Sequence, residues 1–90
     1  MNNKIALESL AMDLKRVALG YHRNSLSMAT CFYGEAMKRK NEIDSSSLKP
    51  YVRKLLDKIE SLQNGSSAEI AEEALMISIL LQNYTQKFSL

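Results

Sequence analysis

Residues 66–88, SSAEIAEEALMISILLQNYTQKF, contain the most apolar run of this 90-residue chain and decide its fold. Ser66 and Glu69 have the spacing of a capping box, in which each residue's side chain bonds to the other's backbone N–H at a helix start. Apolar residues then recur in steps of four and three, at Ile70, Ala74, Ile77, Leu81, Tyr84 and Phe88. Further apolar side chains widen this face at Leu75, Met76, Ile79 and Leu80. The stretch predicts a helix over residues 67–88 that lies at the centre of a bundle or against a partner.

Two earlier segments show the same helical spacing. Within residues 48–63, one face collects Val52, Leu55, Leu56, Ile59 and Leu62 before the helix stop Asn64-Gly65. Near the start of the chain, one apolar column steps through Leu7, Leu10, Leu14, Val17 and Tyr21. A second column recurs every seven residues, at Ile5, Met12, Leu19, Leu26 and Tyr33. Together the two columns predict a broad apolar face of the kind that a bundle helix buries.

Gly20 lies within both columns and costs about 1 kcal/mol relative to alanine in a helix interior. Because the seven-residue repeat continues through it, the sequence favours one long helix over residues 3–40, bent near Gly20. The polar residues 41–47 form a turn whose serines can cap the next helix, and Pro50 fits a first helical turn. Strand-like alternation is absent, so we expect an all-α single domain over residues 1–90, a compact antiparallel bundle of three or four helices.

Positive charge is unevenly distributed along the chain. Residues 1–58 hold eleven of the twelve Lys and Arg residues but only six of the ten acids. Such a local excess is typical of a surface that contacts phosphate, although solvated helix faces also carry many Lys and Arg side chains. The candidate nucleic-acid-binding residues are Lys15, Arg16, Arg23, Lys38, Arg39, Lys40, Lys49, Arg53, Lys54 and Lys58. No helix-turn-helix pattern or aromatic RNA-binding motif accompanies them, so we expect contact with the backbone without sequence readout.

The sequence offers little for catalysis or metal binding. His22 is the only histidine and Cys31 the only cysteine, so we expect no structural zinc site within the chain. Cys31 lies in a mostly apolar stretch, where a small buried side chain is the expected role. The acids from Glu69 to Glu73 are expected to complement the dipole of a helix start. We therefore expect no catalytic residue, no metal and no cofactor.

One spacing nevertheless resembles an enzyme family. Arg16 and His22 form an Arg-x5-His pair, similar to that of the ribonuclease-type HEPN helical domains. In that family the pair acts around an RNA phosphate, so the resemblance implies a ribonuclease. Val17 departs from the polar residue that usually follows the arginine, and the pair comes early in the chain.

As a small helical chain with a basic surface and an apolar helix, the protein also resembles the small subunits of CRISPR interference (Cascade-type) complexes. Those helical bundles hold neighbouring subunits and steer nucleic-acid strands without chemistry. The resemblance is one of architecture and composition, without a diagnostic motif. It implies a non-catalytic subunit of a ribonucleoprotein complex in antiviral defence that contacts DNA or RNA backbone and other protein subunits. The residues it implies as phosphate contacts are Arg16, Arg23, Lys38, Arg39, Lys40, Arg53 and Lys54.

The alternative to a nucleic-acid role is a helical protein-protein adaptor or homodimer whose bases are ordinary solvated residues. Self-association is a general option for a chain of 90 residues, because a core of this size supplies little net stability. No signal peptide is visible, and the longest apolar run, residues 74–81, is too short to span a bilayer. We expect a soluble, cytoplasmic protein with no membrane partner.

Overall fold

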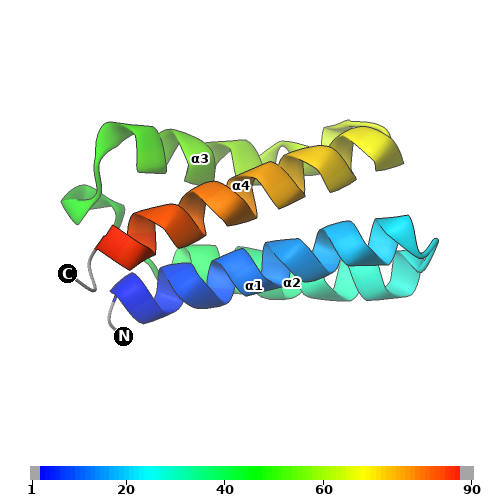
Figure 1. Ribbon diagram of the computed structural model, residues 1–90, viewed down its shortest axis with the longest axis horizontal. Helices are drawn as coiled ribbons and strands as arrows, with labels where there is room; N and C mark the ends of the chain where they lie inside the picture. Colours follow the sequence, from blue (N-terminus) through cyan, green and yellow to red (C-terminus); the bar gives the residue numbers. More distant parts are fainter. Residues whose placement is uncertain (1–2, 88–90) are drawn as a thin grey trace.

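The computed structural model describes residues 3–87, which form four α helices and two short 3-10 turns. The elements are α1 (Asn3–His22), α2 (Leu26–Asn41), η1 (Ser45–Ser47), α3 (Pro50–Glu60), η2 (Leu62–Asn64) and α4 (Ser67–Lys87). Consecutive helices run in opposite directions, and α1 begins at the same end of the bundle where α4 ends (Figure 1). The all-α antiparallel bundle is therefore confirmed, while the predicted helical position Phe88 lies outside the described residues.

The prediction of one long helix over residues 3–40 is wrong, because the chain reverses around Asn24. Asn24 has a φ of 56°, a left-handed conformation that asparagine adopts more readily than most residues. The Ser25 N–H donates to the Gly20 carbonyl at 2.8 Å, which closes the end of α1. The Ser25 hydroxyl accepts a hydrogen bond from the Met28 N–H at 3.4 Å and caps α2. The apolar repeat thus continues through a turn at which the helix itself ends.

Gly20 has a different role from the predicted bend. It lies inside α1, four residues before Asn24, where the Ala29 backbone of α2 lies close by. A Cβ atom at position 20 would lie 2.7 Å from the Ala29 backbone nitrogen and 3.0 Å from the Ala29 Cα. Separations this short are not tolerated between a side chain and a neighbouring backbone. The missing side chain of Gly20 therefore allows α2 to fold back against α1.

The core forms around α1, which packs against α2 on one side and α4 on the other. The fully buried large apolar side chains are Leu7, Leu10, Leu14 and Val17 of α1, Val52 and Ile59 of α3, and Ile77 and Leu81 of α4. The buried residues of α2 are small: Ala29 and Ala36. Its larger apolar residues are only partly buried against the core. The first apolar column and the face of α3 are therefore core positions, as predicted.

Apart from the half-buried Tyr33, the second apolar column is exposed, so its predicted burial is wrong. The widened face of α4 is exposed as well, so the predicted place at the centre of the bundle is wrong, while its contact with a partner stays a prediction. Ile5, Met12 and Leu19 are 54%, 43% and 39% exposed, and Leu26 is 65% exposed. The α4 residues Leu75, Met76, Ile79 and Leu80 are between 37% and 48% exposed. The reason is that each helix has neighbours on only part of its circumference, and these positions lie on the other part. Helix α4 is thus an outer helix of the bundle, and α1 is the one packed along two sides.

The predicted helix starts are only partly correct. The capping box of α4 is confirmed: the Glu69 N–H donates to Ser66 Oγ at 3.3 Å, and the Ser66 N–H donates to Glu69 Oε1 at 3.4 Å. The serines of the preceding turn do not cap α3, since Lys49 is its N-cap and makes no side-chain capping bond. Asp44 instead accepts a hydrogen bond from the Ser46 N–H at 3.1 Å and caps η1.

The two helical glycines give a matched test of the α1–α2 packing. Gly20→Ala is expected to lower the free energy of unfolding by about 1–3 kcal/mol, because the new methyl group collides with the Ala29 backbone. Gly34→Ala is expected to raise it by about 0.5–1 kcal/mol, because position 34 is exposed within α2 and a Cβ there has nothing within 4 Å. Urea unfolding measures both, and equal effects of the two substitutions would contradict the close approach at Gly20.

Candidate nucleic-acid interface

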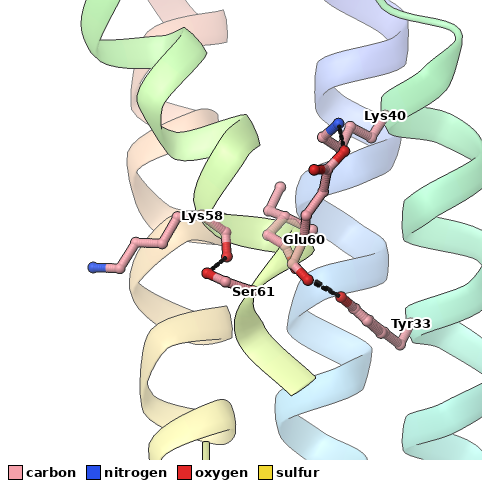
Figure 2. A network of polar contacts seen from close by, with 6 residues as sticks. Tyr33, Lys40, Lys58, Glu60 and Ser61 are labelled. Atoms are coloured by element: carbon pink, nitrogen blue, oxygen red, sulfur yellow. Dashed lines mark hydrogen bonds and ion pairs between the residues drawn. The ribbon is translucent and has the colours of Figure 1, made fainter. Parts of the chain in front are cut away.

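Five of the ten predicted phosphate contacts already pair with acids of the same chain. These ion pairs are Arg16–Asp13, Lys38–Glu35, Arg39–Glu42, Lys40–Glu60 and Lys58–Glu73. The shortest joins Lys40 Nζ to Glu60 Oε1 at 2.6 Å, and the Lys40 side chain is only 14% exposed (Figure 2). Lys40 is therefore primarily a structural link between α2 and α3. Its charge is largely compensated before any ligand arrives.

Arg16 and Arg39 belong to a second structural cluster, around Asp13 of α1. Arg16 Nη1 lies 3.6 Å from Asp13 Oδ1, and its guanidinium carbon lies 5.3 Å from the centre of the Phe32 ring. Arg39 is only 29% exposed and donates to Glu42 Oε2 at 3.2 Å. Asp13 itself is buried, and this loss of solvation raises its pKa, an effect that the positive charges of Arg39 and Arg16 partly offset. The two arginines thus serve to compensate a buried carboxylate.

The remaining five bases have no acid within ion-pair distance in the described part of the chain. Three of them, Lys49, Arg53 and Lys54, lie together at the N-terminal half of α3 and are exposed. Lys15 lies on α1, and Arg23 lies in the α1–α2 turn at the opposite end of the bundle from the start of α3 (Figure 1). The structure therefore places the ten predicted nucleic-acid-binding residues on separate parts of the surface. We call Lys49, Arg53 and Lys54 the α3 basic surface.

A polar hollow adjoins the α3 basic surface where α2 ends. Arg53, Asp57 and Leu56 line it from α3, and Lys40, Asn41, Ile43 and Ser45 line it from α2 and the following segment. Asn41 and Ser45 offer neutral hydrogen-bonding groups beside Arg53. Sequence reasoning has no ground for selecting these two residues, because both belong to a segment whose polarity indicates only a turn. Asp57 adds one negative charge to the same wall.

Side chains of α2 hold α3 in place through its C-terminal turn. The Tyr33 hydroxyl donates to the Ile59 carbonyl at 2.7 Å and lies 3.4 Å from the Glu60 carbonyl oxygen (Figure 2). These are carbonyls that the end of a helix leaves without intrahelical partners. Burial, together with the nearby Glu60 charge, raises the pKa of Tyr33. Tyr33 therefore positions the basic helix.

At the other end of α3, the chain that leads into it is fastened to α1. The Asn3 side-chain amide donates to the Asp44 carbonyl at 3.0 Å and to Ser47 Oγ at 2.9 Å. The Asp44 N–H donates back to Asn3 Oδ1 at 3.1 Å. Together with Tyr33, these bonds fix the orientation of α3 from both ends.

The two residues of the Arg-x5-His pair are not brought together within one copy of the chain. Residues six apart on a helix are separated by about 120° around its axis and about 9 Å along it. Arg16 is held by Asp13 on the side of α2, whereas His22 lines a hollow with Ser67 and Ala68 at the start of α4. The side chains therefore face different neighbours, and this geometry counts against a HEPN-like centre.

The position of Cys31 also differs from expectation. Cys31 is exposed, so the predicted buried position is wrong; it lies on the outer side of α2. Tyr51 is 45% exposed and packs edge-on against Tyr84, with ring centres 5.8 Å apart. Within residues 3–87, His, Cys, Asp and Glu side chains form no group of three or more that could hold a metal ion. None of the described helices has the length and hydropathy that crossing a membrane requires.

Comparison with known proteins gives no relative from which a function could be inferred. No protein-family model, curated protein or solved structure matches this chain. A function can therefore be inferred only from the chemistry of the described surface.

The buried carboxylate of Asp13 predicts a pH-dependent stability. Because its folded-state pKa is raised above 3.8, the wild type loses stability as the pH rises from that value through the folded-state pKa. The amide of Asp13→Asn does not titrate, so the variant gains stability relative to the wild type over this window and keeps the gain above it. Urea unfolding at a series of pH values measures the difference. Asp57→Asn controls for the loss of one carboxylate, and an Asp13→Asn difference that shrinks with rising pH would contradict the assignment.

The Tyr33 hydroxyl can be tested by removing one atom. Tyr33→Phe is expected to lower the free energy of unfolding by about 1 kcal/mol, because the hydrogen bond from the hydroxyl to the Ile59 carbonyl is lost. It is also expected to speed amide hydrogen exchange in α3. Tyr51→Phe, the same change at an exposed tyrosine, is expected to stay within about 0.5 kcal/mol of the wild type. Equal effects of the two substitutions would show that Tyr33 does not fasten α3.

Proposed function

We propose that the protein is a non-catalytic helical module that binds nucleic-acid backbone through the α3 basic surface. The observation that supports this most is the grouping of Lys49, Arg53 and Lys54 on one short helix, exposed and without acids in ion-pair distance among the described residues. Of the other predicted cations, five are paired with acids, while Lys15 lies on α1 and Arg23 lies in the α1–α2 turn. Three neighbouring cations can contact consecutive phosphates of one strand. Three contacts are too few for one copy of the protein to bind tightly.

The chemistry of the surface favours backbone contact over sequence readout. Lysine and arginine head groups on a helix face carry charge to phosphate oxygens, and these contacts are indifferent to base identity. The hollow beside Arg53 adds Asn41 and Ser45, whose side chains can donate hydrogen bonds to a phosphate or sugar oxygen. The negative charge of Asp57, which lines the same hollow, repels a second phosphate at that position. We therefore expect the strand to run along Lys49, Arg53 and Lys54.

A weak backbone contact of this kind acts best within a larger assembly, where other subunits supply further contacts. The small subunits of CRISPR interference complexes, which the chain resembles in architecture, work in this way. We propose such a cytoplasmic nucleoprotein complex, with a role in antiviral defence, as the setting of the protein. The α3 basic surface replaces the wider set of residues that the resemblance implies, because Arg16, Lys38, Arg39 and Lys40 pair with acids.

The salt dependence of binding tests the proposal. For single-stranded DNA or RNA, three phosphate contacts give a slope of about −2 in a plot of log association constant against log salt concentration. The double variant Arg53→Glu/Lys54→Glu is expected to reduce the slope to below about 1 in magnitude, because one cation remains. Arg23→Glu/Lys38→Glu reverses two exposed charges outside α3 and is expected to keep the wild-type slope. Equal loss in both double variants, or no binding by the wild type at low salt, would remove the proposed function.

A second candidate function is that of a helical protein-protein adaptor with no nucleic-acid role. The observation that favours it is the exposed apolar surface of α1 and α4. An adaptor of this kind would show no affinity for single-stranded DNA or RNA at low salt. It would still associate with protein through α4.

A further inference from the structure

Tyr51 of α3 is the one exposed aromatic residue in the described part of the chain. Tyr21, Phe32 and Tyr33 are partly buried against the core. Tyr84 is buried. Tyr51, by contrast, is 45% exposed and belongs to the helix that carries the α3 basic surface. Its ring therefore offers a flat apolar surface to a ligand of that helix.

The contact with Tyr84 holds the Tyr51 ring and leaves one of its faces open. The ring centres lie 5.8 Å apart and the ring planes meet at 88°. Because perpendicular rings meet edge to face, Tyr84 covers at most one of the two faces of Tyr51. Tyr84 is only 5% exposed and is itself fixed in the core. A ring that is held in this way loses little conformational freedom when a flat ligand packs on its open face.

Lys54, a member of the α3 basic surface, lies beside the Tyr51 ring. The two residues are three apart on α3, and both are exposed. Residues at this spacing project from the same side of a helix, with Cβ atoms about 5–6 Å apart. A strand that places a phosphate on Lys54 therefore has the base of the same nucleotide within reach of the ring.

The ring lies on the flank of α3 that is turned away from Asp57. Asp57 lines the hollow toward the end of α2, whereas Tyr51 packs toward α4. The two residues are six apart, which separates them by about 120° around the helix axis. On the α4 side, Glu73 is paired with Lys58 at 3.8 Å, about two turns of α3 away from Tyr51. A strand that passes from Lys54 toward α4 therefore meets the ring and avoids the repulsion of Asp57.

We infer that Tyr51 is a platform on which one base of a single-stranded nucleic acid stacks while Lys54 binds the adjacent phosphate. Proteins that bind single strands combine cations with aromatic rings in this way, and stacking accepts every base because every base has a flat face. In a duplex, neighbouring base pairs cover both faces of each base, so the ring cannot reach them. The ligand is thus a single strand of DNA or RNA. This inference rests on the proposed nucleic-acid role and names its ligand.

Removal of the aromatic ring tests the platform. Tyr51→Leu retains an apolar side chain against Tyr84 but has no flat face. For oligothymidine and oligouridine at one low salt concentration, we expect its affinity to fall about 5- to 100-fold below that of the wild type, the effect of losing one stacked base. Tyr51→Phe keeps the ring and is expected to bind as the wild type does. Leu26→Ala, which shortens an apolar side chain that is 65% exposed on α2, is also expected to bind unchanged.

Two further strands separate the platform from the α3 basic surface. An abasic strand carries phosphates without bases, and a duplex hides its base faces, so Tyr51→Leu is expected to bind both as the wild type does. Equal weakening with the abasic strand would overturn the platform, as would unchanged affinity for both oligothymidine and oligouridine. In either case wild-type binding would leave the proposed function in place. A loss with only one of the two oligomers would support the platform and show whether it takes DNA or RNA. No wild-type binding to any strand at low salt would overturn both proposals.

A fluorescent reporter at the same position measures the contact itself. The chain contains no tryptophan, so Tyr51→Trp introduces a single one. A base that stacks on an indole ring quenches its fluorescence. Oligothymidine is therefore expected to quench Tyr51→Trp and to leave Leu26→Trp unchanged, with circular dichroism confirming that each variant is folded. Equal signals from the two variants at a saturating concentration of oligothymidine would overturn the stacking contact.

Discussion

The close approach of α1 and α2 at Gly20 is the constraint on which the rest of the structure depends. A side chain at this position would meet the Ala29 backbone, so only glycine permits the reversal around Asn24 to bring α2 directly onto α1. With α2 on one side, α1 buries Leu7, Leu10, Leu14 and Val17 against its neighbours. The other side of α1 then receives α4, and α3 closes the bundle over the remaining apolar surface.

The fold also decides which charges remain available to a ligand. Where the bundle brings α2 beside α1 and α3, the basic residues at the end of α2 meet Asp13, Glu42 and Glu60, and their charges compensate acids of the same chain. On the outer side of α3 the neighbouring helices offer no such acids to Lys49, Arg53 and Lys54 within the described residues. A cation that is solvated by water retains its charge for a phosphate, whereas a paired cation must first lose its partner. The candidate interface thus consists of basic residues whose charge is not compensated by an acid in the folded chain.

The α3 basic surface is held in a fixed orientation by the rest of the bundle. Bonds from Tyr33 of α2 hold the C-terminal turn of α3, and bonds from Asn3 of α1 hold the segment that leads into it. Three exposed cations on a helix fixed at both ends lose little freedom when they bind a phosphate backbone. Weak contacts of this kind add up when several binding surfaces are linked in one assembly.

The sequence by itself determined the helical class, the start of α4 and most of the core. The capping box from Ser66 to Glu69 and the apolar steps through Leu7, Leu14 and Ile77 depend on local hydrogen bonds and helical periodicity, which a single chain segment already contains. The tertiary structure decided the rest: the reversal at Asn24, the exposure of Met12 and Ile79, and the ion pairs between helices. Periodicity shows that a residue lies on an apolar stripe but not whether a neighbour covers that stripe. Likewise, the pairs of Arg16, Lys38 and Arg39 join residues three apart in the sequence. The pairs Lys40–Glu60 and Lys58–Glu73 join different helices and depend on how those helices are brought together.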